Sequence, residues 1–191
     1  MRRFMMAVAF GLTAFTLSVA DASAQATVVL TAGLTVPTGD YAEFPEDVND
    51  GAKAGWMGQG AVTFPVGAEG LFLGAGGFYG SNKHEFEGDK TNLFGGSALV
   101  GFRFGEPDMP GGFVYAGGGL MSHQYKSDDF PSLEGTDSGF ALSGGAGATL
   151  PLGTVNGILS ASFTRGFGDV EGTTFFGVSA GLGIPVGGNG M

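Results

Sequence analysis

Alternation between apolar residues and small or polar residues recurs through this chain and constrains its fold more than any other feature. In the clearest run, Val28, Leu30, Ala32, Leu34 and Val36 alternate with threonine, valine and glycine. A period of two residues predicts a β-strand that turns one apolar face to a single side.

The same period returns along the rest of the sequence. The further runs with a clear apolar face are 56–66, 94–104, 140–152, 159–164 and 175–184. The runs 71–81 and 113–124 are also strand-like, but they are rich in glycine and their facing is ambiguous. We therefore predict an all-β fold with about eight strands.

The connections between these runs alternate between long and short. The long ones are 39–53, 82–90, 123–137 and 166–172, and the short ones are 67–70, 105–111 and 153–156. Short turns at one end and longer loops at the other are typical of outer-membrane barrels. The arrangement predicts an up-and-down antiparallel transmembrane β-barrel whose two termini lie at the short-turn end.

The distribution of charge follows the same division. After position 24, 14 of the 17 acidic residues lie in the four long loops, and Glu69, Glu106 and Asp108 lie in short turns. None lies within a predicted strand. A charge on the lipid face costs a few kcal/mol near mid-membrane. A soluble barrel places lysine and glutamate on outer faces that here carry phenylalanine, leucine, valine and alanine. This contrast favours a membrane barrel.

The first 24 residues are typical of a signal peptide. Arg2 and Arg3 precede an apolar run at 4–20, and an Ala-Ser-Ala sequence follows, ending at Ala24. Small residues at this spacing are what a signal peptidase cleaves. A transmembrane anchor is the alternative, but the run is short for one. We expect cleavage between Ala24 and Gln25, and a barrel domain over 25–191.

Composition excludes several classes of function. The chain has 39 glycines, 18 phenylalanines and no cysteine, so disulfides and thiolate metal sites are ruled out. Without the first 24 residues the net charge is −11, which argues against a nucleic-acid partner. Small residues on the inner faces suit the narrow, filled interior of an eight-stranded barrel. We expect no open solute pore and, since a closed barrel has no free edge, a monomer.

Three short motifs resemble a known family. They are Thr-Val-Pro-Thr-Gly-Asp at 35–40, Tyr-Ala-Gly-Gly-Gly at 115–119 and Phe-Gly-Val-Ser-Ala-Gly-Leu at 176–182. Over residues 25–186 the chain resembles the small eight-stranded outer-membrane barrels, similar to the OmpA membrane domain and OmpX. The resemblance implies a location in the outer membrane. It also implies a structural, adhesive or protein-binding role through loops, without selecting among these.

Aromatic residues at the strand ends predict two girdles at the lipid interfaces. Those near the external ends are Trp56, Phe94, Phe140 and Phe176, and those near the periplasmic ends are Phe64, Phe102 and Phe104.

Two arginines occupy strand positions. Arg103 falls on the lumen-facing register, where a charge needs a partner. We expect Glu69, Glu106 or an inward serine or glutamine to provide it. Arg165 lies at the long-loop end of its strand, within reach of anionic head groups.

Acidic residues gather in two external loops. The first loop holds Asp40, Glu43, Glu46, Asp47 and Asp50, and the third holds Asp128 and Asp129. Carboxylates are ligands for Ca²⁺ and Mg²⁺, so bridging of such ions to anionic lipids is one interpretation. We favour the other, in which these are solvated loop charges, and we predict no metal or cofactor site.

The two histidines and a neighbouring serine are the first candidates for catalytic residues. His84 lies beside acidic residues in the second long loop, and His123 follows Ser122 at a strand end. A lipid hydrolase needs a serine, a histidine and an acid brought together. Ser122 and His123 are adjacent, so in a strand they point to opposite faces. We expect no enzyme. A structural or surface-interaction barrel is favoured over a periplasmic lipocalin-like binder or a lipid-modifying barrel enzyme.

Overall fold

A computed structural model describes residues 26–42, 51–67, 69–106, 109–128 and 131–187. Over these residues the chain forms eight strands and three short 3₁₀ helices. The strands are β1 (Ala26–Thr38), β2 (Gly55–Pro65), β3 (Leu71–Lys83), β4 (Lys90–Phe104), β5 (Gly111–Lys126), β6 (Gly135–Leu152), β7 (Val155–Phe167) and β8 (Thr174–Val186). The 3₁₀ helices are η1 (Gly39–Tyr41), η2 (Pro131–Leu133) and η3 (Gly168–Val170).

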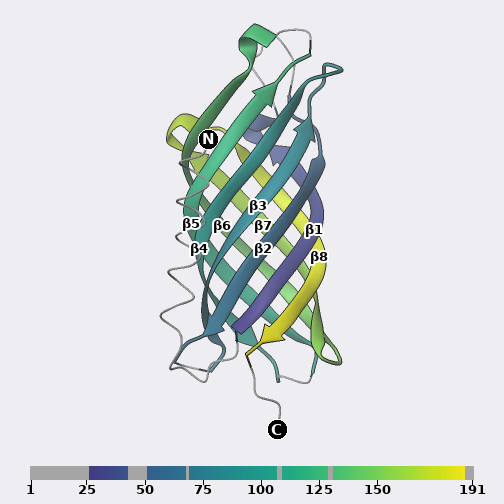
Figure 1. The fold of residues 1–191 in the computed structure, drawn as a ribbon, viewed down its shortest axis with the longest axis vertical. Helices are drawn as coiled ribbons and strands as arrows, with labels where there is room; N and C mark the ends of the chain where they lie inside the picture. Colours follow the sequence, from purple (N-terminus) through teal and green to yellow (C-terminus); the bar gives the residue numbers. More distant parts are fainter. Residues whose placement is uncertain (1–25, 43–50, 68, 107–108, 129–130, 188–191) are drawn as a thin grey trace.

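The strands close into one antiparallel barrel with up-and-down order (Figure 1). Each strand pairs with its neighbour in sequence. β8 returns to pair with β1 along its whole length, from Ala26↔Val186 to Thr38↔Thr174. Closure pairs the backbone groups of all eight strands and leaves no free edge, which is the condition for β-structure in a hydrocarbon layer. The predicted fold class is confirmed.

Long connections and short turns lie at opposite ends of the barrel, as Figure 1 shows with the long ones at the top. The start of β1 and the end of β8 both lie at the short-turn end. Gly67 and Gly70 in the first short turn and Gly153 in the third have positive φ angles, which glycine adopts without steric cost. The predicted asymmetry of the connections is therefore present in the structure.

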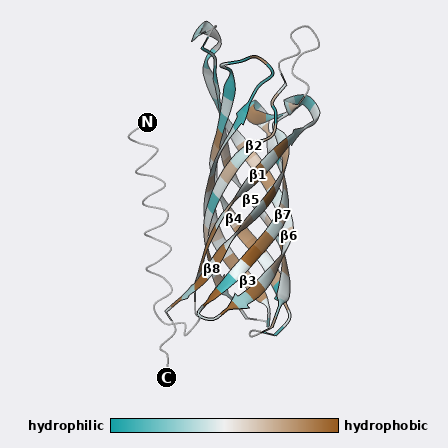
Figure 2. Cartoon of the chain, turned by 90° about the vertical axis from the view of Figure 1, so that its right-hand side faces the viewer, coloured by the Kyte–Doolittle hydropathy of each residue, from teal (hydrophilic) through white to brown (hydrophobic). Residues whose placement is uncertain are grey.

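The outer wall is apolar. Leu34, Trp56 and Val178, all predicted to share the apolar faces, are 64%, 52% and 63% exposed. Their sequence neighbours Thr35 and Met57 are buried, with 0% and 4% of their surface exposed. Figure 2 shows hydrophobic segments along the barrel wall and hydrophilic segments at the end with the long loops. The apolar faces point outward, as the charge distribution predicted.

The two strands with ambiguous facing adopt the same alternation. In β3, Leu73 and Tyr79 face outward and Phe72 faces the lumen. In β5, Leu120 is 59% exposed and Met121 is fully buried. Glycine had hidden both patterns in the sequence, because it marks neither an apolar nor a polar face.

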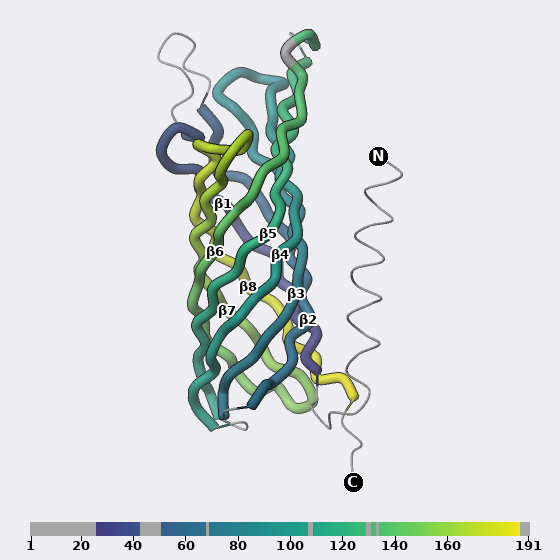
Figure 3. The backbone as a smooth tube through the Cα atoms, turned by 90° about the vertical axis from the view of Figure 1, so that its left-hand side faces the viewer, coloured from purple at the N-terminus to yellow at the C-terminus, as the bar shows by residue number. Residues whose placement is uncertain are grey.

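Several strands extend further at the external end than the alternation predicted. β6 begins at Gly135 rather than near Phe140, and β5 continues to Lys126. Asp137, which was expected in a loop, therefore lies within β6 and pairs with His123 of β5. Beyond the apolar band both faces of these strands are polar, so the hydrophobic period stops while the backbone pairing continues. The β5–β6 hairpin rises above η1 and η3 (Figure 3).

The predicted signal peptide over residues 1–24 and its cleavage between Ala24 and Gln25 lie outside the described residues. Among the residues that are described, no helix has the length and apolar character needed to cross a membrane.

Candidate functional site: the filled lumen and the external rim

Inward side chains form two apolar layers across the lumen. The lower layer lies toward the short turns and consists of Phe72, Phe113 and Ile158, with Val29 and Tyr115 packed against them. The upper layer lies toward the long loops and combines residues of strands and of loops. Its members are Tyr41, Ala52, Met57, Leu93, Met121, Ala141, Val170 and Phe175, with Phe78 packed against them.

Two loop segments fold inward to complete the upper layer. Tyr41 in η1 is 4% exposed and Val170 in η3 is 1% exposed. Val170 packs directly on two glycines, since a Cβ added at Gly139 or Gly166 would overlap atoms of Val170. The absence of side chains at these positions lets η3 dock over the mouth of the barrel. The upper layer therefore includes loop residues at the external end of the lumen.

Each of four lumen aromatics lies directly opposite a glycine of the next strand. The pairs are Phe72↔Gly101, Phe78↔Gly95, Phe113↔Gly147 and Tyr115↔Gly145. In every pair a Cβ added to the glycine would overlap the ring. Large and small residues thus alternate around the lumen, which is how a narrow barrel accommodates aromatic rings. The glycine content predicted to suit a filled interior serves this packing.

A cavity of about 150 Å³ lies between the two layers. Residues of both layers line it, together with a middle belt of Gln59, Ser97, Ser143, Ser160 and Ser162. Ser160 and Ser179 share a hydrogen bond of 2.8 Å across β7 and β8. The volume and the hydroxyl lining suit several water molecules.

Arg103 faces the lumen at its lower end, as predicted. Its Nη2 donates to Oγ1 of Thr63 at 3.3 Å, and its guanidinium lies 5.4 Å from the centroid of the Phe72 ring. Among the described residues, neither Glu69 nor Glu106 forms an ion pair with it. Of the alternatives expected as partners of Arg103, the two glutamates lie in turns beyond the strands, and the hydroxyl that it contacts belongs to Thr63 rather than to a serine. A hydroxyl and an aromatic face take that role.

Buried polar groups form a network just above the upper layer. Asn82, which is fully buried, donates from Nδ2 to Oγ1 of Thr35 at 2.9 Å and to the carbonyl of Lys53 at 2.7 Å. The hydroxyl of Tyr41 donates to Oδ1 of Asn82 at 3.4 Å. Burial raises the pKa of the Tyr41 hydroxyl well above its usual range, so the group remains protonated and can donate. Asn82 of β3 therefore ties the first external loop to β1.

The two histidines join through threonine hydroxyls rather than through a serine hydroxyl. His84 Nε2 lies 2.7 Å from Oγ1 of Thr91, and that hydroxyl lies 3.5 Å from His123 Nε2. His123 Nδ1 lies 3.2 Å from Oγ1 of Thr173. Ser122 instead contacts Ser138, at 2.7 Å between hydroxyls. The predicted opposite facing of Ser122 and His123 is thus present, and the hydroxyls that contact the two histidines belong to threonines.

The described part of the acidic loops shows separate charges. Asp40 lies in the first turn of η1, and Asp128 is exposed at the end of β5. No group of three potential ligand residues that could hold a metal is found among the described residues. The remaining predicted loop acids, Glu43, Glu46, Asp47, Asp50 and Asp129, lie outside them.

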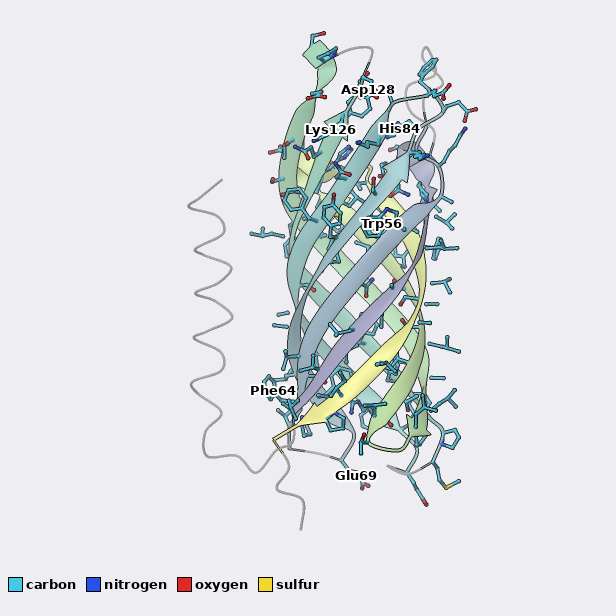
Figure 4. All side chains as sticks on the ribbon, turned by 45° about the vertical axis from the view of Figure 1, so that its right-hand side comes forward. Trp56, Phe64, Glu69, His84, Lys126 and Asp128 are labelled. Carbon is cyan, nitrogen blue, oxygen red and sulfur yellow. The ribbon has the colours of Figure 1, made fainter. Side chains whose placement is uncertain are left out.

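The aromatic residues predicted as girdles all lie on the outward register. Trp56, Phe140 and Phe176 are about half exposed toward the external end, and so are Phe102 and Phe104 toward the short turns. Phe64 and Phe94 share these faces and are partly covered by neighbours. Figure 4 shows Trp56 in the upper part of the wall and Phe64 at the opposite end. Their contact with lipid interfaces stays a prediction.

One grouping of charged residues was not predicted, because the strand register creates it. Lys53, Lys83, Lys90 and Lys126 are all the lysines of the chain. They come from three different connections in the sequence, yet pairing brings them to one sector of the external rim. A sequence signal existed, since each lies where an alternating run meets a long connection.

Comparison with known proteins places the fold. No known protein family and no curated protein matches the sequence. Among solved structures, Neisserial surface protein A superposes with a TM-score of 0.64 at 11% identity, covering 83% of this chain and 96% of that one. The N-terminal barrel of OprF from Pseudomonas aeruginosa gives 0.52 at 17% identity, covering 85% and 98%.

A third structure is Ail, the attachment invasion locus protein of Yersinia pestis, in complex with the heparin analogue sucrose octasulfate. It gives a TM-score of 0.50 at 14% identity and covers 84% of this chain and 99% of that one. Identities this low show the fold alone. The chain has the fold of the small eight-stranded outer-membrane β-barrels, which confirms the resemblance drawn from its sequence.

Proposed function

We propose that this chain is an integral outer-membrane barrel with a structural and surface-interaction role, carried by acidic external loops. The observation that supports this most is the division of the barrel wall. Its outward faces are apolar across all eight strands, whereas charged and polar side chains lie at the end with the long loops. A protein with such a wall is stable only where lipid covers it.

The filled lumen supports interaction at the surface rather than transport. The upper and lower apolar layers cross the barrel above and below a cavity of about 150 Å³. Solute passage would require both layers to separate. Threonine hydroxyls contact both histidines, and the Ser122 hydroxyl contacts Ser138, which supports a role without catalysis.

Liposome swelling tests the closed lumen. We expect phosphatidylcholine liposomes containing the folded protein to swell in arabinose no faster than protein-free liposomes. A general porin reconstituted at the same protein-to-lipid ratio supplies the positive control. Swelling that depends on the folded protein would make this chain a channel and would remove the surface-interaction role as its main function.

A further inference from the structure

The four lysines lie together on a protein whose net charge is −10. Lys83 of β3 is the direct cross-strand partner of Lys90 of β4, and Lys90 is the direct partner of Lys126 of β5. The backbone N–H of Lys53 donates to the carbonyl of Lys83 at 2.7 Å. We call Lys83, Lys90 and Lys126 the lysine row.

The lysine row faces outward. In β3 it shares its register with the exposed Tyr79, in β5 with the exposed Leu120, and in β4 with the exposed Phe102. Neighbouring strands lie about 4.8 Å apart, so the three Cα atoms span roughly 10 Å. Ammonium groups at this spacing can contact one or two phosphate groups together. Figure 4 shows Lys126 at the external end of the barrel, above Trp56.

Side chains below the lysine row are layered by polarity. One step down the same outward face, the register aligns Ser81, Asn92 and Gln124. The next step down aligns Tyr79 with Phe94 and, in β5, with Ser122. Trp56 lies next to Tyr79, with ring centroids 5.6 Å apart. Positive charge, neutral polar groups and then aromatic rings are the order in which a bilayer presents head groups, interface and hydrocarbon.

No lysine of the row forms an ion pair with a carboxylate of the described residues. The ion pair that the structure shows there joins Lys53 to Glu85, with 2.9 Å between Nζ and Oε2. Asp89, in the turn between β3 and β4, is buried and accepts a hydrogen bond from the hydroxyl of Tyr125. Like charges placed directly across strands repel and destabilise the pair. An anion outside the protein, placed against the three lysines, would relieve this repulsion.

We infer that the lysine row binds the phosphate groups of lipid headgroups in the outer leaflet. This rests on the proposed membrane location. The row lies on the outer wall of the barrel and above its aromatic side chains, where a phosphorylated glycolipid would present its phosphates. A soluble polyanion would instead approach from the loop tips, and their acidic residues would repel it. Phosphate on a membrane lipid is therefore the ligand that the position selects.

A titration of the full mature chain tests the inference. Folded protein in dodecylmaltoside micelles is mixed with diphosphorylated lipid A, and the emission of Trp56, the single tryptophan, reports binding. We expect K83Q/K90Q/K126Q to bind about a hundredfold more weakly, since each lysine near an anionic surface contributes about fivefold. K53Q is the matched control, because Lys53 is already paired, and it should change affinity less than twofold.

Parallel arms distinguish the sources of the anion. Lipid A without phosphates should bind to the unmodified protein as weakly as diphosphorylated lipid A binds to the triple variant. Equal affinity for the two lipids, or unchanged affinity in the triple variant, would overturn the inference. Lysine-dependent binding of heparin that exceeds the binding of diphosphorylated lipid A would also overturn it, and would make the row a polysaccharide site.

Two further readouts separate other causes of failure. Without anionic lipid, the triple variant should unfold at the same or a higher urea concentration than the unmodified protein, because repulsion is removed. Earlier unfolding would show that the lysines are structural and would overturn the inference. If the protein inserts into vesicles but its binding of lipid A does not depend on the three lysines, only the inference about the lysine row is refuted. Failure of the unmodified protein to insert would refute the proposed membrane location.

Discussion

Ala180→Arg should destabilise the inserted barrel by about 2–4 kcal/mol, the cost of a basic side chain on the lipid face at mid-membrane. Ala180 is the central residue of β8, faces outward and lies between Ala32 of β1 and Leu159 of β7. The guanidinium would have to enter the hydrocarbon layer or distort it. Urea unfolding in phosphatidylcholine vesicles measures the loss.

Val186→Arg is the matched control on the same face of the same strand. Val186 ends β8 at the short-turn end, where an arginine reaches the interface and should cost at most about 1 kcal/mol. A soluble barrel would tolerate both substitutions alike, because water would cover both positions. Equal unfolding free energies for the two variants would therefore contradict the membrane reading of the wall.

Gly147→Ala should cost about 1–3 kcal/mol, because overpacking forces rings and strands to move. The new methyl group would overlap both the Phe113 ring and the carbonyl oxygen of Leu159. Gly58→Ala is the control, since Gly58 lies on the outward face of β2 and an added Cβ there meets no atom within 4 Å. Urea unfolding should therefore show a clearly larger loss of unfolding free energy for Gly147→Ala than for Gly58→Ala.

A second substitution identifies the ring as a cause of the loss. Phe113→Leu introduced together with Gly147→Ala should recover part of the stability, because residues in contact are energetically coupled. If the two changes simply add, Phe113 and Gly147 do not pack as the structure places them. A neutral Gly147→Ala would show that the lumen is loosely packed and would weaken the case for a closed interior.

The strands and their facing could be predicted wherever branched or aromatic residues mark the lipid side. Val28 to Val36 is such a case, and the outward face of β1 follows that alternation. β3 and β5 could not be assigned, because glycine on both faces removes the contrast. The external extension of β6 to Gly135 was also hidden, since pairing above the membrane requires no apolar face. Hydrophobic periodicity therefore predicts the part of a barrel strand that lipid covers.

The lumen and the rim depend on register, which the sequence leaves open. Phe113 opposite Gly147 and Lys83 opposite Lys90 are pairings between strands, and a shift of one residue would undo both. The docking of Tyr41 and Val170 into the lumen mouth depends on loop conformations for which no periodic pattern exists. The position of Arg103 was predictable from alternation, but its partner Thr63 belongs to another strand and was not.

The most direct test of this account is cell fractionation, with the outer-membrane fraction run on a denaturing gel both unheated and boiled. We predict a band in that fraction whose mobility changes on boiling, as a closed barrel that resists detergent until heated requires. A band found only in the soluble periplasm would contradict a membrane-spanning barrel. The cavity between the two apolar layers would then favour a lipocalin-like binder of small ligands.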